Sequence, residues 1–172
     1  MRFTGLAYRA HDPRWSFTPL SGAGAALYGG RFNPKGVPAL YLSLDPITAL
    51  KEASQGFAHK FEPYLLCTYE IDCEPIVDAR SETSRREAGI DLADMASPWF
   101  EDASQGREPG SWALSGRLMT AGAAGLLTPS FVRTAAASDV NLVLWRWGPQ
   151  PPTQVAVFYP SGRLPKNQLS WT

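Results

Sequence analysis

Apolar residues alternate with polar ones in several stretches of the chain, and glycines and prolines separate these stretches. The alternation predicts a first strand at residues 5–10 and one or two strands within residues 64–79, ending near Asp78. Two more strands are predicted at residues 141–147 and 153–160, joined by the proline-rich sequence GPQPP.

A clear helix start follows the sequence LYLS. Asp45, or Ser43 just before it, can accept hydrogen bonds from the first helical turn, and Pro46 fits that turn because its missing N–H would have no partner there. The helix is predicted to run to about His59. Its core face is predicted to carry Ile47, Leu50 and Phe57, and its other face Thr48, Glu52, Gln55 and His59.

The remaining segments predict a short helical turn, a polar excursion and a buried helix. Residues 23–28 favour the helical turn over a phosphate-binding glycine loop, because Leu27 replaces the third glycine of that motif. Residues 81–109 are polar and predict a loop-rich excursion with one short helix, whereas residues 112–127 predict a buried helix. The chain, residues 1–172, is therefore predicted to be a single α+β domain with a mixed or antiparallel sheet.

The sequence LYGGRFNPKGVPALYLS places an arginine directly after two glycines. Its NPKG stretch, residues 33–36, has the proline and glycine spacing of a type I turn, so residues 31–32 and 40–42 are predicted to form the arms of a hairpin. Side chains of the second arm should alternate between two faces: Leu40 and Leu42 on the core face, Tyr41 and Ser43 on the opposite face.

Composition and charge narrow the class of protein. Of the 172 residues, 44% are hydrophobic and 19% are charged, which is typical of a globular domain that can bury its own core. The basic and acidic side chains, 16 of each, cancel, so the total charge gives no sign of a nucleic-acid partner. The start of the chain lacks a signal-peptide pattern and no apolar run is long enough to span a bilayer, so a cytoplasmic protein is expected.

The cysteines and histidines do not have the spacing of a metal site. Cys67 and Cys73 lie in a predicted strand and its exit, and His11 and His59 are not placed to complete a zinc site with them. A disulfide between the cysteines would require the strand to fold back on itself. Two buried thiols and no metal are therefore predicted.

Arg31, Tyr41 and Glu52 have complementary chemistry and lie in successive predicted elements, which usually pack together. A guanidinium binds phosphate oxygens through two parallel hydrogen bonds, and a tyrosine ring can stack on nicotinamide. A carboxylate beside a sugar can stabilise an oxocarbenium-like transition state. Together the three side chains suggest a site that cleaves the glycosidic bond of NAD, with Gly29 and Gly30 letting the backbone approach the ligand.

Each of these residues also has an ordinary interpretation. Arg31 can be a solvated charge after a turn, Tyr41 can pack within its strand, and Glu52 can be an exposed helix residue. Spacing alone does not separate these alternatives from a functional site.

Several motifs of the sequence resemble the RES-domain family, which is named after an arginine, a glutamate and a serine. The resemblance covers most of the chain, with residues 81–109 the least characteristic part. It matches the family arginine to Arg31, the glutamate to Glu52, the serine to Ser130 and an aromatic position to Tyr41. The motifs are YRA at residues 8–10, GAGAALYGGRFNPKGVPALYLSLDPITALKEA at residues 22–53, PS at residues 129–130 and NLVL at residues 141–144.

The resemblance implies a fold similar to that of the diphtheria-toxin-like ADP-ribosyltransferases. It also implies the toxin of a bacterial type II toxin–antitoxin pair, neutralised by an antitoxin with a helix-turn-helix DNA-binding domain. Members of this family consume NAD⁺ by hydrolysis, by phosphorolysis or by transfer of ADP-ribose to a protein. The acceptor in this chain therefore stays open between water, phosphate and a protein target.

The resemblance further implies a role for each matched residue. Arg31 would grip the pyrophosphate, Tyr41 would stack on nicotinamide, Glu52 would stabilise the ribosyl cation, and Ser130 would hydrogen-bond the ribose or the nicotinamide amide. NAD⁺ is then the substrate, and no metal or other cofactor is implied. Further candidates for phosphate or adenine contacts are Lys35, Arg9, Tyr28 and His59.

Two other functions are compatible with the sequence. One is a nucleotide-binding regulatory module that senses NAD or an ADP-ribose derivative without cleaving it. The other is a structural domain in which Arg31 and Glu52 pair with each other. Expression separates the first from a toxin, because a toxin that consumes NAD should be hard to express without its partner, whereas a sensor should be tolerated.

Overall fold

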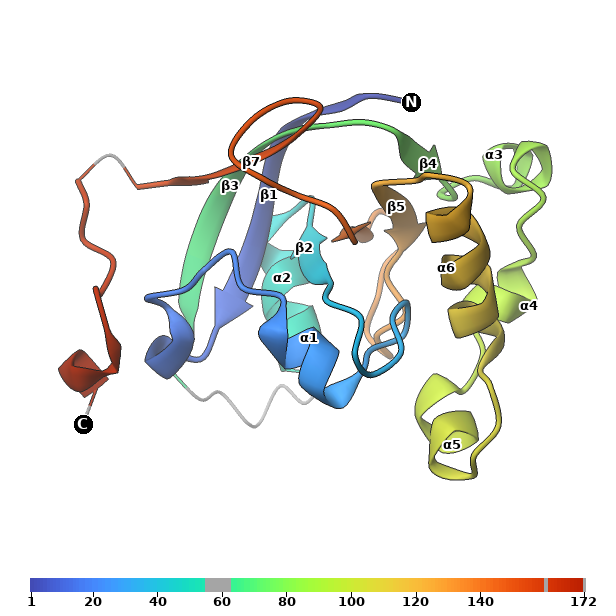
Figure 1. Cartoon of the computed structure of the whole chain (residues 1–172), viewed down its shortest axis with the longest axis horizontal. Coiled ribbons are helices and arrows are strands. Elements are labelled where there is room, and N and C mark those ends of the chain that lie inside the picture. The colour runs from blue at the N-terminus through green and yellow to red at the C-terminus, as the bar shows by residue number, and fades with distance from the viewer. Residues whose placement is uncertain (55–62, 160, 172) are drawn as a thin grey trace.

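One mixed sheet of seven strands forms the centre of the computed structural model, which describes residues 1–54, 63–159 and 161–171 (Figure 1). The strands are β1 (Phe3–His11), β2 (Leu40–Ser43), β3 (Leu65–Cys73), β4 (Ile76–Asp78), β5 (Gly125–Pro129), β6 (Val140–Leu144) and β7 (Thr153–Phe158). Their spatial order is β4-β5-β6-β2-β1-β3-β7, and each neighbouring pair is antiparallel except β4 and β5, which are parallel.

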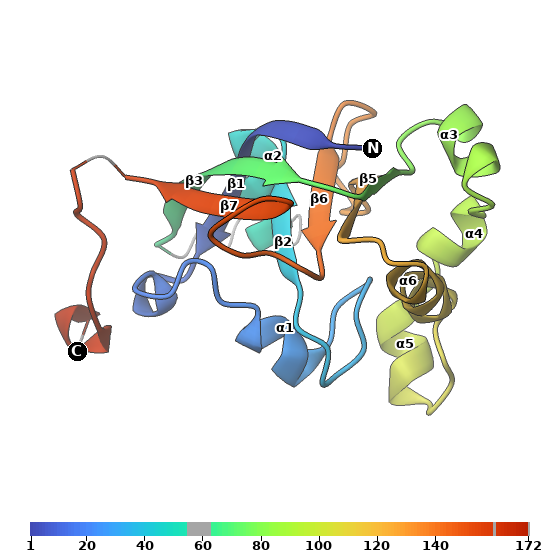
Figure 2. The same ribbon diagram turned by 45° about the horizontal axis from the view of Figure 1, so that its top comes forward.

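Short helices flank this sheet. They are α1 (Ala23–Tyr28), α2 (Pro46–Ala53), α3 (Glu82–Glu87), α4 (Leu92–Met95), α5 (Trp99–Ser104) and α6 (Gly110–Thr120), together with the 3₁₀ turns η1 (Pro13–Trp15) and η2 (Gln168–Trp171). Helix α2 packs against β1, β2 and β3, while α3 to α6 gather beside the β4–β5 end of the sheet (Figure 2). The C-terminal segment lies at the opposite end, beyond β7 (Figure 2). The predicted α+β class with a mixed sheet is confirmed.

The hydrophobic core has two parts, because both faces of the central strands are covered. Leu40 and Leu42 belong to one cluster, which includes Tyr69 of β3. Tyr41, between them in sequence, packs against the other cluster, which includes Leu114 of α6. The alternation predicted for residues 40–42 is therefore confirmed.

Elements with strong local signals form as predicted. Strand β1 contains the predicted residues 5–10, and α1 occupies the predicted residues 23–28. At the start of α2, the Asp45 carboxylate accepts hydrogen bonds from the N–H groups of Ile47 and Thr48, at 2.8 and 3.1 Å. The predicted continuation of this helix to His59, including Gln55 and Phe57, lies outside the described residues.

The predicted hairpin between residues 31–32 and 40–42 is wrong. Residues 30–33 form their own tight turn, in which Gly30 and Asn33 exchange backbone hydrogen bonds, and β2 pairs with β1 and β6 instead. The NPKG turn is also shifted by one residue, since the backbone bond runs from Val37 N–H to the Pro34 carbonyl. Gly36 then takes the third position, where its positive φ of 90° suits a residue without a side chain.

Three further expectations are corrected. Residues 81–109 contain the three helices α3, α4 and α5 rather than one. The predicted helix over residues 112–127 ends at Thr120, and Gly125–Pro129 is strand β5. Ile47 is 58% exposed, whereas Thr48, expected on the opposite face, is fully buried, and its hydroxyl is satisfied there by a hydrogen bond to the buried Asp139 carboxylate.

Candidate active site

Glu52 lies in the last turn of α2, and the start of that helix fixes its position. Only Leu44 and Asp45 separate β2 from α2, so the Asp45 cap holds the helix directly at the end of a central strand. Glu52 is the seventh of the eight residues of α2. Its side chain faces the sheet, where it contacts Asn141 of β6.

Two side chains donate hydrogen bonds to one oxygen of the Glu52 carboxylate. The Ser130 hydroxyl donates to Oε1 at 2.7 Å, and the Asn141 amide Nδ2 donates to the same oxygen. Ser130 follows β5 and Asn141 lies on β6, so the contacts join two strands to α2. The second oxygen, Oε2, accepts no hydrogen bond from the described part of the chain.

Ser130 is held rigidly for this contact. It is only 9% exposed, its N–H donates to the Asp139 carbonyl at 2.8 Å, and its hydroxyl also accepts from the Val132 N–H at 3.3 Å. The loop that follows Ser130 is therefore closed at its base by Asp139.

The Asp139 carboxylate ties this loop to α2. It accepts hydrogen bonds from the Thr48 hydroxyl at 2.9 Å, the Lys51 ammonium at 2.7 Å and the Ala136 N–H at 2.8 Å. The hydrogen bond from Lys51 is the largest of the effects that hold the pKa of Asp139 below its usual range, followed by that from the Ala136 N–H. Thr48 and Lys51 lie on the same helix as Glu52, so the loop that carries Ser130 and the helix that carries Glu52 form one connected unit.

Arg31 sits at the tip of the turn formed by residues 30–33. Its Nη1 donates to the carbonyl oxygens of Met95 and Ser97, at 3.1 and 2.8 Å, and its guanidinium lies 4.8 Å from the centre of the Phe131 ring. Within the described residues, Nε and Nη2 have no protein hydrogen bond. These two donors form one edge of the guanidinium fork, the edge that binds an anion in two parallel bonds.

Burial lowers the pKa of Arg31, and the negative charge of Glu52 acts in the opposite direction. The two charges are thus close enough to influence each other, yet they form no ion pair: Arg31 bonds to backbone carbonyls, and Glu52 bonds to Ser130 and Asn141. The alternative in which Arg31 and Glu52 simply pair with each other is therefore wrong.

Tyr41 supports the turn that carries Arg31. Its hydroxyl donates to Asn33 Oδ1 at 2.7 Å and accepts from the Phe32 N–H at 3.0 Å. Burial is the main cause that raises the pKa of Tyr41 well above its usual value, so the phenol stays neutral. A Cβ on Gly30 would lie 2.6 Å from the Tyr41 hydroxyl oxygen, so this glycine is needed for a contact within the protein rather than for a ligand.

The other residues predicted to contact the ligand make no hydrogen bond to Glu52 or Arg31 within the described residues. Lys35 is exposed in the turn after Pro34, and Tyr28, at the end of α1, is 73% exposed. Arg9 follows Tyr8, which pairs with Ser43 on the face that carries Asn141; Arg9 therefore points to the opposite face, where it donates to the Ser21 carbonyl at 3.2 Å. His59 lies outside the described residues.

Sequence reasoning missed Asn141, Phe131 and the carbonyl groups of Met95 and Ser97. Asn141 had a signal: it is a polar residue in the strongly apolar strand VNLVL, and buried polar groups there need partners. The carbonyl groups had none, because every residue type supplies the same backbone oxygen.

Nothing in the described part of the chain resembles a metal site: no group of three or more His, Cys, Asp or Glu side chains is placed to hold an ion. Cys67 and Cys73 are both buried and not bonded to each other, and burial raises the pKa of the Cys73 thiol to about 11. Among the described residues, no helix has the length and apolar character needed to cross a membrane.

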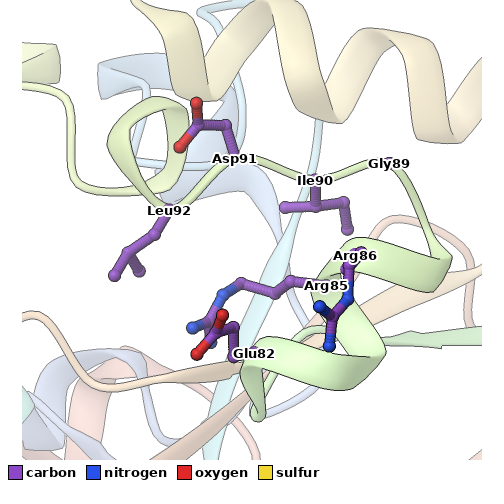
Figure 3. A pocket seen from close by; sticks show the side chains of 7 residues that line it. All are labelled: Glu82, Arg85, Arg86, Gly89, Ile90, Asp91 and Leu92. Atoms are coloured by element: carbon purple, nitrogen blue, oxygen red, sulfur yellow. The ribbon is translucent and has the colours of Figure 1, made fainter.

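A shallow hollow on α3 and the turn after it lies apart from these residues (Figure 3). Its lining carries charges of both signs: Glu82 lies beside Arg85, Arg86 lies on the same helix, and Asp91 lies farther along the chain with its carboxylate directed away from the two arginines (Figure 3). None of the predicted site residues lines it. The group around Glu52 and Arg31 is therefore the candidate active site.

Comparison with known proteins places the chain in a family. A solved structure described as the crystal structure of the M. tuberculosis MbcT–MbcA toxin–antitoxin complex is similar to this chain, with a TM-score of 0.64 and 22% sequence identity over 92% of this chain and 84% of that one. No curated protein matches the chain in sequence. The RES domain family matches residues 6–167, nearly the whole chain, which includes Arg31, Glu52 and Ser130. The chain therefore belongs to the RES domain family.

Proposed function

We propose that this protein is the toxin of a toxin–antitoxin pair and that it cleaves the bond between nicotinamide and ribose in NAD⁺. The observation that carries the proposal is the Glu52 carboxylate, whose Oε1 accepts from two donors, together with Arg31; within the described residues Glu52 Oε2 and the Nε and Nη2 of Arg31 make no hydrogen bond. A fixed anion and a free guanidinium fork match the two charged parts of the NAD⁺ reaction, the ribosyl cation and the pyrophosphate.

The reaction then follows from these charges. The bond between C1′ of the ribose and the pyridinium nitrogen breaks, and its electron pair leaves with nicotinamide, which becomes neutral. Glu52 stabilises the cationic ribose through Oε2, and Arg31 holds the pyrophosphate through Nε and Nη2. An acceptor forms the new bond to C1′ and releases a proton. Water, phosphate and a protein side chain would give hydrolysis, phosphorolysis and ADP-ribosyl transfer, respectively.

Ser130 and Tyr41 support this chemistry mainly through protein contacts. The Ser130 hydroxyl hydrogen is donated to Glu52, so the serine would orient the carboxylate. The Tyr41 hydroxyl is occupied by Asn33 and Phe32, which leaves its ring as the part that can stack on nicotinamide. Lys35 and Tyr28, both exposed, would contact the distal phosphate or adenine.

The proposed partner is an antitoxin with a helix-turn-helix DNA-binding domain, and the proposed site of action is the bacterial cytoplasm. The similarity to a chain of a toxin–antitoxin complex and membership of the RES domain family support this partner.

Controlled expression in bacteria tests the proposal. Induction of the wild-type chain should arrest growth and deplete cellular NAD⁺, and Glu52→Gln should do neither at the same protein level. A regulatory module that only binds nucleotides would leave both growth and NAD⁺ unchanged in the two strains, and that result would contradict the proposal.

A further inference from the structure

Asn141 contacts the same oxygen of Glu52 as Ser130, and the reaction steps proposed above do not say what this second donor contributes. Its Nδ2 donates to Glu52 Oε1, and its Oδ1 accepts a 2.7 Å hydrogen bond from the Ser43 hydroxyl. Ser43, Asn141 and Glu52 thus form a continuous chain of hydrogen bonds from a central strand to the candidate catalytic carboxylate.

Strand pairing fixes this chain. Ser43 of β2 and Asn141 of β6 are direct cross-strand partners, and Asn141 is also the direct partner of Thr128 on β5. Direct partners point to the same face of a sheet, with their Cβ atoms about 4.5–5.5 Å apart. The amide of Asn141 is therefore held beneath α2 by the sheet register rather than by a flexible loop.

The charge of Glu52 sets the direction of every bond in the chain. An ionised carboxylate only accepts hydrogen bonds, so Asn141 must turn its NH₂ group toward Glu52 and its oxygen toward Ser43. Ser43 must then donate its hydroxyl hydrogen to that oxygen. Ser43 is 3% exposed, so little water competes for this bond.

Two donors on one oxygen restrict how the carboxylate can rotate. With Ser130 alone, Glu52 could swing about a single hydrogen bond, whereas the additional bond from Asn141 fixes the plane of the carboxylate and the direction of Oε2. Groups oriented before the reaction stabilise a developing charge without reorganising, which lowers the barrier more than it strengthens substrate binding.

We propose that Asn141 is a positioning residue, braced by Ser43, that orients Glu52 toward the ribosyl cation. The inference rests on the NAD⁺ cleavage proposed above. Asn141 acts through Glu52 and has no substrate contact of its own, so its loss should appear in kcat and not in KM.

Steady-state rates of nicotinamide release from NAD⁺ test this role. Asn141→Ala should lower kcat about ten- to a hundredfold with KM for NAD⁺ within about twofold of wild type. Asn141→Asp keeps the size of the side chain but turns a hydrogen-bond acceptor toward Glu52. Its kcat should therefore fall at least as much as that of Asn141→Ala. Ser43→Ala should lower kcat less, by a few fold.

Thr128→Val is the matched control. Thr128 is buried on the same sheet face beside Asn141, but its hydroxyl donates to the Pro129 carbonyl, so the kcat of the Thr128→Val variant should equal that of wild type.

Circular dichroism and thermal unfolding identify the folded variants, and Asn141→Asp and Ser43→Ala decide the question if Asn141→Ala does not fold. A folded Asn141 variant with kcat within twofold of wild type would overturn the inference, as would a rise in KM at unchanged kcat or an equal loss in Thr128→Val. Any of these three outcomes would overturn the role of Asn141 alone, because the wild-type protein would still release nicotinamide. Wild-type protein that releases no nicotinamide would instead overturn the proposed function, and this inference with it.

Discussion

Ser130 and Glu52 are 78 residues apart in the sequence and are joined by a 2.7 Å hydrogen bond from the serine hydroxyl to a carboxylate oxygen. The contact depends on β5 and β6 pairing beside β2, because that pairing brings the loop after β5 to the end of α2. The contact thus joins the loop after β5 to helix α2, and the negative charge of Glu52 acts to raise the pKa of Arg31.

Ser130→Ala tests the serine as a support for Glu52. The substitution removes one of the two donors to Oε1 and leaves Asn141 in place, so kcat should fall about ten- to a hundredfold, the effect of losing a hydrogen bond to a charged group. Stability should change by only about 1 kcal/mol, because the Val132 N–H loses a long and partly exposed acceptor. Wild-type turnover in the folded variant would show that the contact has no role in the reaction.

Arg31→Lys tests the guanidinium as a pyrophosphate ligand. Lysine keeps the positive charge but cannot offer two parallel donors, so KM for NAD⁺ should rise about tenfold while kcat changes less. Arg86→Lys is the control, since Arg86 is exposed on α3 and lies outside the candidate site. An unchanged KM in Arg31→Lys would argue against a pyrophosphate contact at this residue.

Gly30→Ala should destabilise the protein. The added Cβ would lie 2.6 Å from the Tyr41 hydroxyl oxygen and 2.8 Å from Asn33 Oδ1, so the turn that carries Arg31 must shift, at a cost of about 1–3 kcal/mol. Gly24→Ala is a matched control, because nothing lies within 4 Å of its added Cβ and alanine favours the helix there. Thermal unfolding of both variants measures the difference, and equal melting temperatures would show that the turn is free to move.

Asp139→Asn should destabilise the protein in a pH-dependent way. The pKa of Asp139 in the folded protein lies below its ordinary value of 3.8, so its interactions with Lys51 and the Ala136 N–H contribute stability above that value and lose it as the pH falls through the folded pKa. The variant should therefore melt a few degrees below wild type at pH 7, and the difference should shrink below about pH 4.

Asp72→Asn provides the comparison for this experiment. Asp72 pairs with Arg2, whose side chain is 56% exposed, and such surface pairs contribute little. The melting temperature of Asp72→Asn should stay close to wild type at pH 7. A pH-independent loss in Asp139→Asn would contradict the role of its charge in closing the loop after Ser130.

Local chemistry explains which elements the sequence predicted. The Asp45 cap and Pro46 define the start of α2 within a few residues, and Gly22 and Gly29 flank α1 without a side-chain cap. Strand β5 was missed because four of its five residues are buried on one face or the other, so the apolar run shows no alternation and looks like a buried helix. Periodicity also misplaced Thr48, which is buried with its hydroxyl bonded to Asp139.

The candidate site was predictable only in part. Arg31, Glu52 and Ser130 carry chemistry that suggests a site, and they lie in motifs that resemble the RES domain family. Their geometry depends on long-range strand pairing, which a local pattern does not contain: the partners of β2 are β1 and β6, not the neighbouring residues 31–32. The carbonyl groups that orient Arg31 come from residues 95 and 97, in the segment whose sequence is least characteristic of the family.

The most direct test of the central claim is nicotinamide release by the purified chain, free of any antitoxin. The protein is incubated with NAD⁺, with and without phosphate and with bacterial lysate, and mass spectrometry follows nicotinamide and labelled ADP-ribose. The account predicts release by wild type and by the control Glu70→Gln, an exposed glutamate on β3, and a loss of about a hundredfold or more in Glu52→Gln. The species that carries the label identifies the acceptor. Folded wild-type protein that releases no nicotinamide, or a folded Glu52→Gln variant with nearly full activity, would contradict the account.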